Sequence, residues 1–254
     1  MTARRTLWVI VALVAAPASA EVSFDPALAA REARRQMLRR GEDAGEISLA
    51  LAAIFGRAKR QREVFHYISE ARRQGVAASR TDLLLGAFYR STARYDAAFS
   101  TFVRVLVRHE DQPYALVQLW KTLYECKLQG SEVRTDTDMV RERLAAAGLY
   151  FPKEFKIAPA PLATARKLSA TAYNALLAGK AQFAAELFEA AIDALPSDSQ
   201  AHRGLGIARA RLQDFSRAAG AYLLYLELNP QAPDADEVDR VLMRYWRGRS
   251  REVK

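Results

Sequence analysis

The sequence is poor in the residues from which catalytic and metal sites are most often built. Of its 254 residues, one is cysteine and three are histidine. A single cysteine excludes an intrachain disulfide and any metal site that needs several thiolates. Cys126 lies in the apolar stretch LWKTLYECKL, which favours burial as a small hydrophobic side chain. The alternative, in an oxidising compartment, is a disulfide to another chain.

The histidines also form no recognised catalytic pattern. His66, His109 and His202 are far apart, and neither His-x-x-x-His nor His-Glu-x-x-His occurs. The chain also lacks a Gly-x-Ser-x-Gly turn and a glycine-rich phosphate loop. We therefore expect a non-enzymatic protein with no catalytic residue, no metal and no cofactor, and we expect His202 to pack between helices. The alternative is an enzyme whose site follows no known motif.

Long hydrophobic runs are absent except at the start of the chain. Arg4 and Arg5 precede the apolar run Leu7–Ala16, and residues 18–20 (ASA) fit a signal-peptidase site. The run is short for a bilayer span, which favours cleavage near Glu21 over a retained anchor. Because the Ala- and Arg-rich composition is typical of bacteria, we expect the mature protein in the periplasm.

Charge of one sign predominates. The 38 Lys and Arg residues exceed the 29 Asp and Glu residues and give a formal net charge of +9. Such a surface favours anionic partners, although the arginines can also simply solvate helix faces between many alanines. An exported location argues against nucleic acid as the partner. We expect contact with the membrane only through associated proteins.

Helical patterns fill most of the chain, whereas strand alternation and hairpin dipeptides are missing. Asp25 and Pro26 are typical of a helix start, and Asp136 or Thr137 is expected to cap a later helix, near Asp138. The expected helices are Pro26–Arg40, Glu46–Arg57, Gln61–Gln74, Arg80–Thr92, Tyr95–Arg108, Pro113–Leu128, Thr137–Ala147, Ala165–Ala178, Ala181–Leu195, Ser199–Leu212, Phe215–Leu228 and Asp234–Trp246.

The segment Leu149–Pro161 breaks this pattern with three prolines and is interpreted as an irregular connector. It could be a solvated linker, but its content of large apolar residues favours packing onto the helices. These apolar residues are Leu149, Tyr150, Phe151, Phe155 and Ile157.

Two stretches on the C-terminal side of this connector align without a gap at an offset of 34 residues: Ala165–Asp198 and Ser199–Ala232. A third copy lies at Ser79–Gln112. A fixed period of this length is typical of a helical repeat array. The positions shared by the first two copies pair Ala184 with Ala218, Phe188 with Tyr222, Ala191 with Tyr225 and Pro196 with Pro230.

These residues resemble the tetratricopeptide repeat, a unit of two antiparallel helices. Leu205-Gly206, Phe215, Ala218, Tyr222 and Pro230 stand at the family's positions in one copy, and Leu85-Gly86, Tyr89, Tyr95, Ala98 and Phe102 in the third. Tyr225 and Ala181 depart from the usual residues, and Glu110 replaces the terminal proline. The segments 21–75 and 113–148 match poorly.

The resemblance implies an all-α, right-handed α-solenoid of antiparallel helix pairs, preceded by the signal helix and closed by a C-terminal capping helix. The expected parts are a signal peptide (1–20), an N-terminal sub-array (21–148), the connector (149–163), two repeat units (164–232), and a capping helix with a basic tail (233–254).

The resemblance also implies a concave groove, lined by the first helix of each unit, that binds a protein or peptide partner. The expected groove residues are Arg80, Leu83, Ala87, Arg166, Ser169, Tyr173, Arg203, Ile207, Ala210 and Arg211. Ala87, Tyr173 and Ile207 stand where the family's carboxylate-gripping groove has asparagine, which argues against binding of chaperone tails. We expect a periplasmic scaffold in a cell-envelope assembly. The alternative is a binder of an anionic envelope polymer, glycan or lipopolysaccharide, through basic faces such as Arg244–Lys254.

Overall fold

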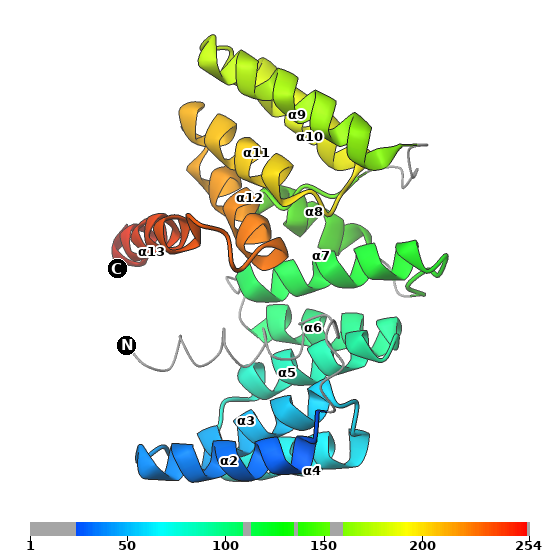
Figure 1. The fold of residues 1–254 in the computed structure, drawn as a ribbon, viewed down its shortest axis with the longest axis vertical. Coiled ribbons are helices and arrows are strands. Elements are labelled where there is room, and N and C mark those ends of the chain that lie inside the picture. Colours follow the sequence, from blue (N-terminus) through cyan, green and yellow to red (C-terminus); the bar gives the residue numbers. More distant parts are fainter. Residues whose placement is uncertain (1–23, 109–112, 135–136, 153–159, 253–254) are drawn as a thin grey trace. The chain divides into compact units, whose positions relative to one another are not determined.

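A computed structural model describes residues 24–108, 113–134, 137–152 and 160–252, with side chains described as far as residue 245. The described chain is all-α and contains no strand (Figure 1). The expected signal segment and cleavage site, His109, Asp136, Phe155 and Ile157 lie outside these residues. No described helix is long and apolar enough to cross a membrane.

The chain divides into two compact units, Met1–Thr135 and Asp136–Lys254. The first contains α2 (Pro26–Arg39), α3 (Ala44–Arg57), α4 (Gln61–Arg73), α5 (Ala78–Ser91), α6 (Tyr95–Arg108) and α7 (Pro113–Leu128). The second contains α8 (Asp138–Ala146), α9 (Pro161–Leu177), α10 (Ala181–Ala194), α11 (Ser199–Arg211), α12 (Phe215–Leu228) and α13 (Ala235–Glu252). The sequence placed the helix near 137–147 in the N-terminal sub-array, whereas in the structure α8 packs on α12 of the second unit.

Two helix starts test the capping residues predicted from the sequence. The Asp25 carboxylate accepts hydrogen bonds from the backbone N–H groups of Ala27 and Leu28, at 2.8 and 3.3 Å, and Pro26 occupies the first turn as predicted. In α8 Thr137 stands at the N-cap position, one of the two expected, but its side chain makes no cap hydrogen bond. Instead its hydroxyl accepts a hydrogen bond from Arg141 Nε at 3.3 Å.

The expected connector is shorter than predicted, since α9 already begins at Pro161. Proline suits a first helical turn, where its missing N–H has no intrahelical partner. At the other end, Leu149 is buried, and the Tyr150 hydroxyl donates a hydrogen bond to Asp193 at 2.8 Å. The described part of this segment therefore packs onto the second unit.

Four helix hairpins share one turn geometry. Lys59, Ala93, Gly179 and Gln213, the residues between the paired helices, all have φ between +54° and +74°. Lys59 and Ala93 are 34 residues apart, as are Gly179 and Gln213. The first pair shows that α3–α4 is a further repeat, which the sequence comparison missed because Val64 and Ile68 stand where the other copies have alanine and an aromatic residue. Both are buried, at 0% and 3% exposure.

We expect Gln213→Gly to stabilise the second unit by about 0.5 kcal/mol. A side chain at positive φ costs about 1 kcal/mol, part of which the greater freedom of unfolded glycine offsets. The preceding hairpin already has a glycine, Gly179, at the equivalent position of its turn. The urea midpoint of unfolding measures the effect, with Gln213→Ala as the control that should bring no gain.

Small residues on each first helix let a large residue of the paired helix lie close. A methyl group added at Gly86 would lie 2.5 Å from the Phe102 ring, and one at Gly206 would lie 2.8 Å from Tyr222. In the intermediate copy, Ala172 and the Phe188 side chain are both fully buried. The repeated small and large positions of the sequence therefore form the core, as the resemblance predicts.

Two single residues have the predicted buried positions. Cys126 is 2% exposed, and burial raises the pKa of its thiol. The His202 side chain is fully buried between helices of the second unit, with Nε2 2.9 Å from the carbonyl oxygen of Pro196. Since a carbonyl only accepts hydrogen bonds, this contact places the imidazole proton on Nε2.

Candidate partner-binding surface

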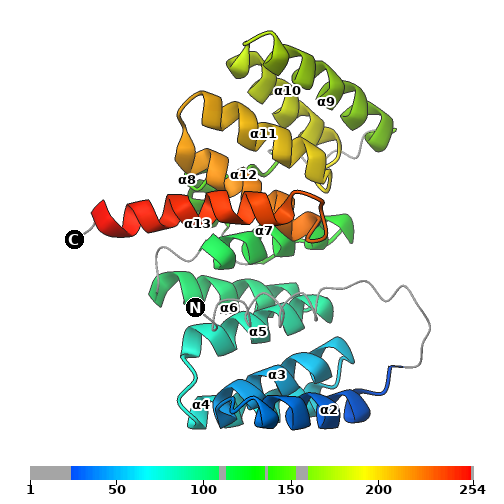
Figure 2. The same cartoon turned by 60° about the vertical axis from the view of Figure 1, so that its left-hand side comes forward.

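Within each unit, the first helices of successive hairpins contact one another. Helices α3, α5 and α7 contact in this way in the first unit, and α9 contacts α11 in the second. Figures 1 and 2 show these hairpins stacked in chain order within each unit. The contacts make one layer of first helices per unit, and this layer carries all ten residues predicted to line the groove.

In the first unit, the predicted groove residues are engaged within the fold. Arg80 of α5 forms an ion pair with Glu46 of α3, in which both guanidinium Nη atoms donate to the carboxylate. The contact to Glu46 raises the pKa of Arg80 above its ordinary value. Leu83 and Ala87 are each 2% exposed. These two side chains pack in the core and do not present a surface to a partner, because first-helix positions also face the neighbouring hairpins.

In the second unit, the predicted residues range from exposed to buried. Arg166 and Arg211 are exposed, and Arg211 also donates a hydrogen bond to the backbone oxygen of Leu176. Ser169 is 7% exposed, and its hydroxyl has no hydrogen-bond partner among the described residues. The remaining four, Tyr173, Arg203, Ile207 and Ala210, are partly buried.

The structure joins two of these residues into a polar group that we call the tyrosine–arginine cluster: Tyr173, Arg203, Tyr222, Tyr225 and Asp234. Arg203 Nε donates to Asp234 Oδ2 at 2.7 Å, and Tyr225 donates its hydroxyl proton to Asp234 Oδ1. The Tyr173 hydroxyl donates to the backbone oxygen of Gln200 at 3.2 Å. These contacts join α9, α11 and α12 to the residue that precedes α13.

The charges in the cluster stabilise one another. The hydrogen bond from Tyr225, with the nearby Arg203 charge, holds the pKa of Asp234 below its ordinary value. Burial lowers the pKa of Arg203, but its contacts with Asp234 and Tyr173 outweigh that effect and raise it. Burial and the bond to Asp234 raise the pKa of Tyr225 to about 12. Near neutral pH the cluster therefore holds one ion pair, Arg203 with Asp234, and its tyrosine hydroxyl groups are protonated.

The sequence pointed to only part of this cluster. Tyr173 and Arg203 were predicted as groove residues, whereas Asp234 was interpreted only as a helix start and Tyr225 as a large residue in a small position. Tyr225 is nevertheless 1% exposed, because its ring fills the core while its hydroxyl reaches Asp234. A pair of opposite charges 31 residues apart carries no periodic signal, which is why the sequence did not reveal it.

The cluster offers hydrogen-bond donors, aromatic edges and a fixed guanidinium rather than a nucleophile with a base. Among the described residues, no group of three His, Cys, Asp or Glu side chains could hold a metal ion. Burial lowers the pKa of His202 to about 4, so its imidazole is neutral at physiological pH. What this arrangement can do is contact another molecule through partly exposed aromatic and basic side chains.

Comparison with known proteins gives only weak similarities. No family model matches the chain, and no curated protein matches it. Among solved structures, MamA 41-end from Desulfovibrio magneticus RS-1 is 18% identical, with a TM-score of 0.31, over 83% of this chain and 98% of that chain. A MamA RS-1 ArsTM double mutant is also 18% identical, with a TM-score of 0.31, over 82% and 96% of the two chains. At this level the similarity assigns the chain to no family.

Proposed function

We propose that the protein is a non-enzymatic scaffold that binds a protein or peptide partner on the first helices of its repeats. The observation that carries this proposal is the layer formed by α9 and α11, which carries the exposed Arg166 and Arg211 together with Tyr173 and Arg203, the partly exposed first-helix members of the tyrosine–arginine cluster. Aromatic and arginine side chains contribute most to many protein interfaces.

The cluster favours binding because its side chains are already held in place. Arg203 is fixed by Asp234, and the tyrosines are held by burial and by hydrogen bonds. A partner therefore meets a surface that loses little side-chain entropy on binding. This differs from a flexible basic patch, whose long side chains must be ordered by the partner.

The proposed setting is the bacterial periplasm, within a cell-envelope assembly. It is supported by the signal-like residues at the start of the chain and by the basic, alanine-rich composition. In this setting the membrane is reached through associated proteins.

We expect Arg166→Glu to abolish capture of the partner, because charge reversal on the exposed first-helix surface repels an acidic segment. The matched control is Lys167→Glu, which makes the same charge change on an exposed residue of the same helix, about a quarter turn away. The measurement is affinity capture from an envelope extract with mass spectrometry. Equal loss with both variants would refute a specific surface on α9.

Arg203 is a poor choice for this test, since its reversal would place a second carboxylate against Asp234 and disturb the cluster. Salt titration of the captured complex distinguishes this proposal from the alternative function, binding of an anionic polymer. Capture that falls steeply with salt and disappears when residues 244–254 are deleted would indicate an anionic polymer bound to the basic tail.

A further inference from the structure

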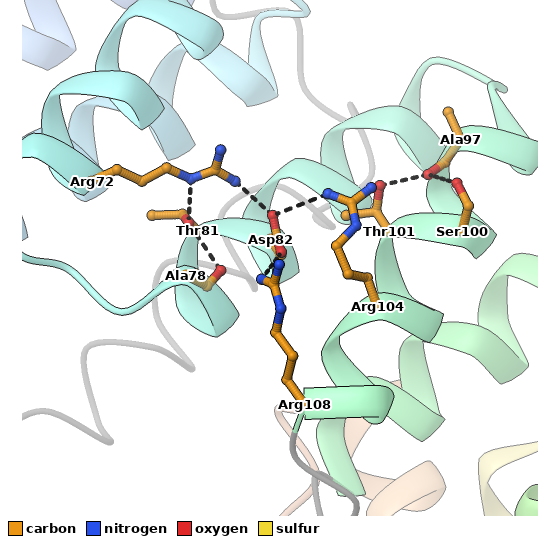
Figure 3. A network of polar contacts seen from close by, with 9 residues as sticks. All are labelled: Arg72, Ala78, Thr81, Asp82, Ala97, Ser100, Thr101, Arg104 and Arg108. Carbon is orange, nitrogen blue, oxygen red and sulfur yellow. Dashed lines mark hydrogen bonds and ion pairs between the residues drawn. The ribbon is translucent and has the colours of Figure 1, made fainter.

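The first unit contains a buried carboxylate surrounded by three arginines from two other helices. Asp82 of α5 is 1% exposed. Its Oδ1 lies 2.6 Å from Arg72 Nη2 of α4 and 3.9 Å from Arg104 Nη1 of α6, and its Oδ2 lies 3.2 Å from Arg108 Nη1. Figure 3 shows the three side chains converging on it. We call these four residues the arginine cluster.

The arginine cluster has more positive charge than its own fold requires. Three guanidinium groups face one carboxylate, so two positive charges remain without a carboxylate in the described part of the chain. Among the described residues these three arginines form no other ion pair. By contrast, the neighbouring Arg80 and Arg73 each have a carboxylate of their own.

The surplus charge is accessible. The side chains of Arg72, Arg104 and Arg108 are 43%, 48% and 48% exposed. A guanidinium group has five N–H donors, and Arg72 uses one for Thr81 Oγ1 at 2.9 Å and one for Asp82. Arg108 uses one for Asp82. Donors on all three groups are therefore left for a ligand.

An exposed apolar side chain adjoins these charges. Val107 is 68% exposed and lies on α6, in the turn of helix that carries Arg104 and Arg108. Residues three or four apart on a helix share one face, so Arg104 and Val107 are neighbours on the surface. The site thus combines an apolar contact with two charges that no described carboxylate compensates.

We propose that the arginine cluster binds carboxylate side chains of an acidic, partly apolar peptide segment. The planar guanidinium fork fits a carboxylate through paired hydrogen bonds. Asp82 occupies the inner side of the three groups and accepts one hydrogen bond from Arg72 and one from Arg108, which leaves the outer N–H donors free to pair with a ligand carboxylate. Two carboxylates of the segment match the two surplus charges. The proposal goes beyond the proposed function, because it names the chemistry of a partner and places it on α4 and α6 of the first unit.

The test is a direct titration of the full mature chain with a fluorescein-labelled peptide of sequence EELEEL, followed by fluorescence anisotropy. We expect R104Q/R108Q to weaken binding about tenfold or more, since two charge-assisted contacts are lost. R104K/R108K, which keeps the charge but not the fork, should bind with intermediate affinity. The peptide QQLQQL should not bind. The variants retain the Arg72–Asp82 pair, and circular dichroism checks that they are folded.

The matched control is R31Q/R34Q, which removes two exposed arginines of α2 in the same unit. We expect its affinity to stay within twofold of the parent chain. Equal weakening by both double variants would overturn the proposal and indicate attraction by net charge alone. Stronger competition by inorganic phosphate than by acetate at equal ionic strength would also overturn it, in favour of a phosphate site. So would binding seen only after E110Q/D111N, because the chain's own carboxylates would then occupy the cluster.

The outcome is independent of the surface on α9. The peptide titration needs no natural partner, and Arg166→Glu leaves the arginine cluster intact. Loss of partner capture with intact EELEEL binding, or the reverse, therefore assigns a failure to one site.

Discussion

Gly220→Ala is expected to destabilise the second unit by about 3 kcal/mol, more than any other single methyl group added to a helix of this unit. The new methyl would lie 2.0 Å from the backbone oxygen of Ala147 and 2.8 Å from the carbonyl carbon of Gly148. Backbone atoms cannot rotate away as a side chain does, so α12 and the end of α8 must separate. The loss of packing exceeds the gain of about 1 kcal/mol in helix propensity.

The control for this prediction is Gly206→Ala. The three atoms nearest to its methyl group would all belong to the ring of Tyr222, the first at 2.8 Å, and this partly buried ring can shift. We expect a loss of about 1 kcal/mol. Urea unfolding followed by far-UV circular dichroism compares the two variants. If both lost the same stability, α8 would not be held against α12 as the structure shows.

Two features of the structure require glycine at position 148. Its φ is +75°, as expected for a residue that ends a helix. A methyl group there would also lie 2.2 Å from the Cα atom of Arg217. The sequence predicted the helix end, but the close approach to α12 is visible only in the structure.

The second large effect is expected from pH. His202 is fully buried, and burial lowers its pKa from 6.5 to about 4. In the unfolded chain this histidine binds a proton below pH 6.5, whereas in the folded chain it does so only near pH 4. The contribution of neutral His202 is therefore fully present above pH 6.5 and is lost as pH falls toward 4. At pH 5 we expect a loss of about 2 kcal/mol relative to pH 7.

The variant that tests this is His202→Phe, whose ring has a similar size and no ionisable group. At pH 7 it should cost about 1 kcal/mol, because the hydrogen bond to the Pro196 oxygen is lost. Between pH 7 and pH 5 the parent chain should lose about 2 kcal/mol more than the variant. Subtracting the two profiles of unfolding free energy against pH removes the contribution of the carboxylates, which titrate in both proteins. Parallel pH profiles of the parent chain and the variant would contradict the prediction, because His202 would then bind a proton equally well in the folded and the unfolded chain.

Several helix boundaries could be predicted from sequence because their causes are local. Asp25 accepts hydrogen bonds at the start of α2, and α6, α7 and α12 have the predicted bounds. The 34-residue period predicted the hairpins from small and aromatic residues that do meet in the core. The helices α3 and α4 were predicted but not recognised as a repeat, since aliphatic residues fill the same volume without the family's recognisable residue types.

The candidate site was predictable only in part. The first helices do form a contacting layer in each unit, which the repeat pattern implies. The sequence could not show that Leu83 and Ala87 are buried or that Arg80 is paired with Glu46, because both depend on how neighbouring hairpins stack. Arg166 and Arg211 remain the predicted residues with exposed side chains.

The sequence by itself determined the helical class, the repeat spacing and the basic character of this chain, since these follow from periodicity and composition. Only the tertiary structure decided which charges meet: Arg203 with Asp234, and Asp82 with arginines of α4 and α6. Helix patterns arise from neighbours three or four residues apart, whereas these ion pairs join residues 10 to 31 positions apart. Their geometry depends on how close the packed helices lie, and small residues such as Gly206 and Gly220 set that distance.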